Sequence, residues 1–221
     1  MGDIDSTKIK KTVPLKVHIA GGHSLFRMGL HSDHDFKMDK DVFKITQKSK
    51  PRLAICDVEQ FLEQLGDIRS EEQSVDLIVL DVGSEDIFHM SDDDSPENEA
   101  GALYQLACDL VRSGRTQYVI LCAVLWRGQV GDNADPSGEY NQYVDLFNAK
   151  LENLAKKNPE VFYWEHEKLV QQRVIHGKYL CRNGYNLTKP GLALVYESYL
   201  EAIKMWEGEY QKTVCLKTND Y

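Results

Sequence analysis

Three loops in the sequence carry polar side chains that could take part in chemistry. The first holds Ser24 at the start of an apolar-spaced segment, and the amide end of a helix behind it would favour developing negative charge. The second holds Glu85 directly after a long apolar run, and the third holds Asn183 and Asn186 ahead of the last helical segment. In a parallel sheet, loops of this kind meet at the carboxyl ends of the strands, where ligands bind. The sequence therefore predicts one site built from these loops.

Metal-ligating residue types also occur in two places. Asp81, Glu85 and Asp86 lie close together, so a divalent cation could bind there, and residues 31–35 read His-Ser-Asp-His-Asp. Closely spaced ligands on a charged loop lack the preformed scaffold that a metal site needs. The five cysteines have no CxxC spacing and mostly lie in apolar contexts, which indicates buried thiols. We expect no metal and no cofactor.

Trp126 and Arg127 follow another apolar run, which predicts that they lie at the rim of the site. A ring beside a guanidinium group could stack on a base or a sugar. Simple packing at the rim is the alternative, and we favour it.

The elements that position these loops alternate between strands and helices. Apolar runs bounded by turn residues predict strands at residues 15–20, 52–56, 75–82, 117–126 and 161–164. Helical spacing predicts helices from residue 25 onward and at 58–65, 101–113, 140–157 and 188–206, with the acidic segment 91–99 as a solvated loop. This alternation indicates an α/β fold, a single three-layer sandwich in which helices cover an approximately five-stranded parallel sheet. We expect the α/β domain at 14–207, between flexible tails at 1–13 and 208–221.

Charge and hydropathy exclude several classes of protein. Asp and Glu total 35 against 26 Lys and Arg, a net charge of −9, so purely electrostatic binding of nucleic acid would need a local basic patch. No apolar run is long enough for a membrane span, and the N-terminus has no signal-peptide core. The sequence thus predicts a cytoplasmic protein.

The three loops together resemble the SGNH (GDSL-type) esterase family, whose motifs include Gly-Asp-Ser-Leu, Gly-x-Asn-Asp and Asp-x-x-His. The matching segments are Gly22-His23-Ser24-Leu25, Gly83-Ser84-Glu85-Asp86 and Asn183-Gly184-Tyr185-Asn186. The sequence is also similar to the esterase-like domains in the first reading frames of animal non-LTR retrotransposons, with Phe26-Arg27 adding to that likeness. The resemblance covers residues 15–206 and implies the SGNH, flavodoxin-like arrangement of the sandwich.

The resemblance implies a serine hydrolase, and this chain departs from the family at several of the residues that catalysis requires. Ser24 stands at the nucleophile position, but Asn186 replaces the histidine base, and an amide cannot accept the serine proton. Asn183 replaces the aspartate and lacks the charge that stabilises an imidazolium. Glu85 replaces the oxyanion asparagine, and its carboxylate would repel an oxyanion. We expect ester hydrolysis by the family mechanism to be lost.

Two histidines are candidate substitute bases. His23 adjoins Ser24, although consecutive residues at a helix start point in different directions. His166 follows the fifth predicted strand, near the ligand edge but outside the loop of the missing histidine. An active serine esterase or acetylhydrolase that uses Ser24 with one of them is the alternative function.

The leading hypothesis is a catalytically inactive SGNH-fold domain, derived from a retroelement, that acts as a binding or scaffolding module. A protein partner or self-association fits the charge, since nucleic acid would need a cluster such as Arg127, Lys178 and Arg182. RNA is a partner by resemblance only, because other inactive members of this fold class bind RNA.

Overall fold

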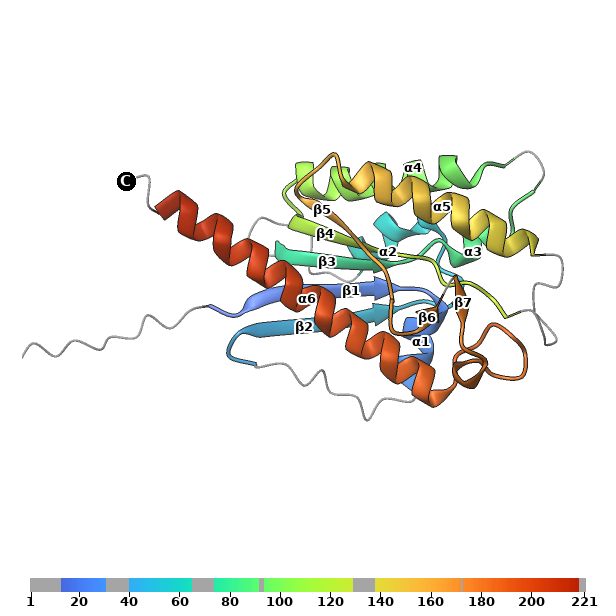
Figure 1. The fold of residues 1–221 in the computed structure, drawn as a ribbon. Helices are drawn as coiled ribbons and strands as arrows, with labels where there is room; N and C mark the ends of the chain where they lie inside the picture. The colour runs from blue at the N-terminus through green and yellow to red at the C-terminus, as the bar shows by residue number, and fades with distance from the viewer. Residues whose placement is uncertain are drawn as a thin grey trace, which may run out of the picture.

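The computed structural model describes residues 13–30, 40–64, 74–91, 94–128, 138–171 and 173–218. They form a three-layer α/β sandwich around a five-stranded parallel sheet with strand order β2-β1-β3-β4-β5, so the predicted fold class is confirmed (Figure 1). The strands are β1 (Leu15–Gly21), β2 (Phe43–Ser49), β3 (Val75–Asp81), β4 (Thr116–Cys122) and β5 (Val161–Trp164).

Helices cover both faces of the sheet (Figure 1). On one face lie α1 (His23–Leu30) and α6 (Lys189–Thr218); on the other lie α2 (Val58–Gln64), α4 (Pro96–Arg112) and α5 (Glu139–Ala155). The short elements are α3 (Ser84–Phe88), the 3-10 helices η1 (Ile55–Asp57) and η3 (Gly177–Tyr179), and the antiparallel pair β6 (Val170–Gln171) and β7 (Val174–Ile175). None of the helices that the structure describes is long and apolar enough to cross a membrane.

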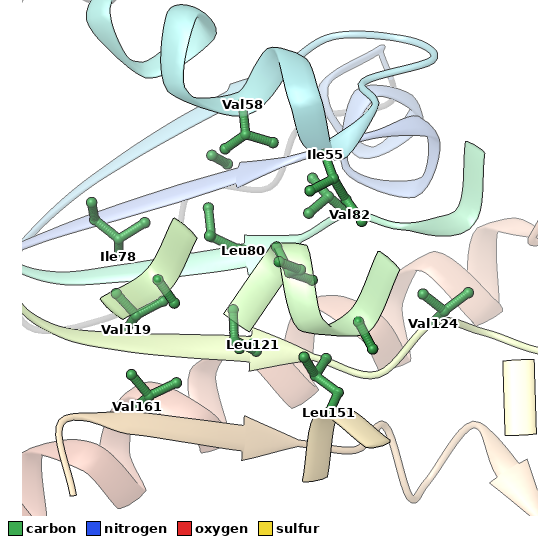
Figure 2. Packing of buried hydrophobic residues seen from close by; sticks show 14 of the residues in the cluster. Ile55, Val58, Ile78, Leu80, Val82, Val119, Leu121, Val124, Leu151 and Val161 are labelled. Atoms are coloured by element: carbon green, nitrogen blue, oxygen red, sulfur yellow. The ribbon is translucent and has the colours of Figure 1, made fainter. Parts of the chain in front are cut away.

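The buried side chains of the central strands alternate between the two faces, as strand geometry requires. Leu77 and Val79 pack with α1 and α6, whereas Ile78 and Leu80 pack with α2, α4 and α5 (Figure 2). Because β3 is covered on both sides, its sequence is nearly all apolar, and it was predicted within one residue of its observed end.

The prediction of the second strand, at residues 52–56, is wrong. The strand is Phe43–Ser49, in a segment where no strand was predicted, while residues 52–56 form a turn followed by η1. β2 is an edge strand with β1 as its partner, so it can expose Lys44 and Lys48 to solvent. Leu53 is buried because it packs in the core under α2.

Three boundaries differ from the prediction by more than two residues. β4 ends at Cys122; the Ala123 amide still donates to the Trp164 carbonyl of β5 at 2.8 Å, but residues 123–128 belong to no strand. The acidic segment is partly helical, because Ser95 caps α4 by accepting a hydrogen bond from the Asn98 amide and Pro96 begins the helix. α6 continues to Thr218, beyond the predicted end of the last helix at residue 206. Most of the predicted N-terminal tail lies outside the described residues.

Candidate functional site

A cavity of about 440 Å³ lies at the carboxyl ends of the parallel strands. Its walls come from loops that are far apart in the sequence and that the sheet brings to one edge. The lining residues are Ser24, Pro51, Arg52, Ser84, Glu85, Phe88, His89, Leu125, Trp126, Arg127, Tyr140 and Tyr185. The volume falls within the range of small-molecule sites. Ser24, Glu85, Trp126 and Arg127 were all predicted to lie at this site, and all four line the cavity.

Ser24 is the second residue of α1 and is half-buried in the cavity wall. Gly21 allows the end of β1 to lie directly against β3, because a Cβ atom there would lie 2.9 Å from the carbonyl oxygen of Asp81. The amide of the next residue, Gly22, donates a hydrogen bond to that same oxygen at 3.0 Å. This close approach places the serine beside the loop after β3. The side chain of His23 lies outside the described part of the chain, so its role as a base stays a prediction.

The loop after β3 brings Glu85 to the cavity and uses Asp86 for structure. The Asp86 carboxylate accepts the Ile55 amide at 3.0 Å and 3.3 Å, which ties α3 to η1. Burial raises the pKa of Asp86, and the hydrogen bond from Ile55 acts in the opposite direction. Glu85 hydrogen-bonds the His89 ring, with 2.9 Å between Oε1 and Nε2, and its Oε1 lies 3.9 Å from Nε of Arg52.

His89 was missed by sequence reasoning, although it lines the cavity together with Ser24. The available signal was its spacing of four residues from Glu85, which places both side chains on one face of a helical turn. Without the position of α3 relative to α1, that spacing did not connect His89 with the serine.

The loop before α6 uses its two asparagines differently from a catalytic pair. Oδ1 of Asn183 accepts the backbone amides of Asn186 at 3.0 Å and Tyr185 at 3.3 Å, so this side chain stabilises the turn. The Asn186 carbonyl accepts the Cys181 amide at 2.6 Å. Asn186 does not line the cavity; its neighbour Tyr185 does.

His166 lies in the core under α6 rather than in the cavity wall. Its Nδ1 is 2.9 Å from Oγ of Ser198, and that hydroxyl accepts a hydrogen bond from Nε1 of Trp164 at the same distance. The ring also makes an edge contact with Tyr199. Burial lowers the pKa of His166, which favours the neutral ring.

Arg127 is fixed both at its backbone and at its guanidinium group. The side-chain amide of Asn141 accepts the Arg127 amide at 2.8 Å and donates to the Arg127 carbonyl at 3.0 Å. The guanidinium carbon lies 4.1 Å from the ring centroid of Tyr140, 4.2 Å from that of Phe88 and 5.2 Å from that of Tyr185. These are cation–π distances.

Trp126, by contrast, is only 4% exposed and donates its Nε1 hydrogen to Asp145 at 2.9 Å. It therefore supports the cavity wall and offers little ring surface for stacking.

The carboxylates near the end of β3 have separate partners. Asp81 accepts a hydrogen bond from the Tyr199 hydroxyl, Asp86 binds the Ile55 amide, and Glu85 binds His89. Within the described residues, no group of three His, Cys, Asp or Glu side chains could hold a metal ion. The predicted cluster at residues 31–35 lies outside that part of the chain.

No protein-family model matches the sequence, and neither does any curated protein sequence. The structure is similar to that of a GDSL-like lipase from Bacteroides thetaiotaomicron, with a TM-score of 0.65, 18% identity, and coverage of 88% of this chain and 92% of the lipase. It is also similar to a catalytic mutant of an acetylxylan esterase from Geobacillus stearothermophilus, with a TM-score of 0.59, 12% identity, and coverage of 86% and 95%. The chain therefore has the fold of the SGNH hydrolases.

Proposed function

We propose that this chain is an SGNH-fold domain that has lost ester hydrolysis and keeps the cavity as a ligand-binding pocket. The observation that carries the proposal is the loop before α6, which turns Tyr185 and not a base toward the cavity, while Asn183 holds its own turn. A serine hydroxyl without a base is a weak nucleophile.

The charge in the cavity wall supports the same conclusion. Glu85 lies there in place of a neutral donor, and a carboxylate raises the energy of an oxyanion transition state. Loss of a triad member costs about 10⁴-fold in rate, and loss of one oxyanion donor about 10²- to 10³-fold, with overlap between them. Together these changes reduce the family's reaction to near background.

We further propose that the domain acts in the cytoplasm through a protein partner or through self-association, and that it descends from a retroelement reading frame. The net charge of −9 supports a protein partner over a nucleic acid. The likeness of the first and third loops to retrotransposon esterase-like domains supports the origin.

Hydrolysis is tested directly with a fluorophosphonate probe and with 4-nitrophenyl acetate. We expect wild type to match Ser24→Ala in both measurements, because Ser24 has no base in reach from the loop before α6. Stoichiometric labelling of wild type that is absent in Ser24→Ala would overturn the proposal.

A second candidate function rests on His89. Ser24, His89 and Glu85 line one cavity, and Glu85 already hydrogen-bonds the ring in the way that an orienting carboxylate does. In that reaction His89 would take the serine proton as the acyl carbon is attacked and return it to the leaving alcohol. Turnover that disappears in His89→Gln, but not in the exposed control His176→Gln, would favour this hydrolase.

A further inference from the structure

The cavity differs from the rest of this acidic chain in its charge. Its described lining carries two arginines, Arg52 and Arg127, against one carboxylate, Glu85. Glu85 already has His89 at 2.9 Å and Arg52 at 3.9 Å. Arg127 is therefore the cationic side chain of the wall that has no carboxylate within ion-pair distance among the described residues.

The guanidinium of Arg127 is held in a way that suits recognition. Rings from α3, α5 and the loop before α6 surround it, namely Phe88, Tyr140 and Tyr185, and Asn141 anchors its backbone. A guanidinium group in cation–π contact with rings keeps its five N–H groups as donors for hydrogen bonds to a ligand. An arginine that is ordered before binding loses little conformational entropy when it takes a ligand.

We propose that the cavity binds a small anionic ligand whose carboxylate or phosphate group is taken by Arg127. The planar fork of the guanidinium matches two oxygens of either group, which Lys would not do. The neighbouring rings would contact an apolar portion of the ligand, and the hydroxyl of Ser24 lines the same space. The inference rests on the proposed binding function and names its ligand class.

Because the chain has a net negative charge, anion binding must depend on short-range contacts within the cavity. A chain at −9 repels anions at long range, and this effect is screened beyond about 8 Å at physiological salt. Contact with a fixed guanidinium inside a half-enclosed cavity is screened far less than that. We therefore expect small anions to bind and polyanions that cannot enter the cavity to be excluded.

The test uses benzoate and phenylphosphonate as probes, with benzamide as the neutral control of similar shape. We expect both anions to bind the wild-type protein more tightly than benzamide does. We expect Arg127→Gln to reduce the affinity for both anions by on the order of ten- to hundred-fold. Arg112→Gln removes an exposed arginine at the far end of the sheet and should change nothing. A preference between the two anions identifies the carboxylate or the phosphate as the ligand group.

Two outcomes overturn the inference: benzamide that binds as tightly as benzoate, or anion binding that is unchanged in Arg127→Gln. If benzamide binds as tightly as benzoate, the proposed ligand-binding function still holds, but with a neutral ligand. Ester turnover that requires Ser24 would instead overturn the proposed function, and the measured binding of anions by Arg127 would be unaffected. Thermal melts establish that each variant folds. Should Arg127→Gln not fold, Arg127→Lys decides the matter, because it keeps the charge but loses the planar fork, and undiminished binding in it would contradict the inference.

Discussion

Gly83 fixes the start of α3, and replacing it with alanine should be among the most damaging small changes in the chain. Its φ of 108° lies in the left-handed region, which costs an alanine about 1–2 kcal/mol. The new Cβ would also lie 2.9 Å from Cζ of Phe147 and 3.1 Å from Cγ2 of Val124, both in the buried core. Overpacking of this kind costs about 1–3 kcal/mol. We expect Gly83→Ala to lower the free energy of unfolding by about 2–5 kcal/mol.

Substitutions at two other glycines distinguish the cost of the left-handed backbone conformation from the cost of overpacking. Gly114 has a φ of 72° with no atom within 4 Å of a built Cβ, so Gly114→Ala tests backbone conformation alone and should cost about 1–2 kcal/mol. Gly101 lies within α4 with open space around it, so Gly101→Ala should stabilise the protein by about 0.5–1 kcal/mol. Urea unfolding followed by circular dichroism measures all three. A loss in Gly83→Ala no larger than that in Gly114→Ala would refute the packing argument.

Three further predictions concern stability and partners. Asn148 is buried and pairs with both the amide and the carbonyl of Val124 at 2.9 Å, so Asn148→Ala should cost about 2–5 kcal/mol in urea unfolding; a loss below 1 kcal/mol would contradict this. Burial lowers the folded pKa of His166, so its contribution to stability is present above the unfolded value of about 6.5 and is lost as the pH falls toward the lowered value. The stability difference between wild type and His166→Leu should therefore shrink as the pH falls from about 7.5 to about 5, and a difference independent of pH would refute that reasoning. Random single-stranded RNA should not bind at physiological salt, whereas light scattering should show self-association or a bound protein; submicromolar RNA binding that Arg127→Glu or Arg182→Glu abolishes would contradict the charge argument.

The fold could be predicted where burial alone determines the pattern. β3 was predicted closely because it lies between two strands and under helices on both faces, which requires apolar residues. β5 is an edge strand like β2, but its four residues are all apolar or aromatic, so its sequence still indicated a strand. β2 was missed because it lies at an edge of the sheet and pairs with one strand only. Its exposed side can therefore carry lysines, and its sequence lacks the apolar run of a buried strand. The apolar Leu53 and Ile55 then looked like a strand, although they pack under α2 from a turn and η1.

The sequence allowed us to predict which loops form the site, but not which side chains in those loops contact one another. The order of elements fixed which loops meet at the carboxyl edge, so Ser24, Glu85 and Arg127 were found together. The direction of each side chain depends on distances that motifs do not encode, and for that reason His89 was missed. The same limit applies to His166, which lies after the right strand and yet packs under α6.

The bonds that shape the cavity do not depend on catalysis. The Gly22 amide binds the Asp81 carbonyl, the Ile55 amide binds Asp86, and the Gly128 amide binds the carbonyl of Gly184 at 2.7 Å. None of these contacts passes through the hydroxyl of Ser24, so a chain can lose its base without losing the pocket. The chain shares its fold with esterases, and a shared fold by itself carries no information about the reaction. In this chain the wall carries the guanidinium of Arg127, which contacts three aromatic rings, and the proposed recognition of an anion depends on that group.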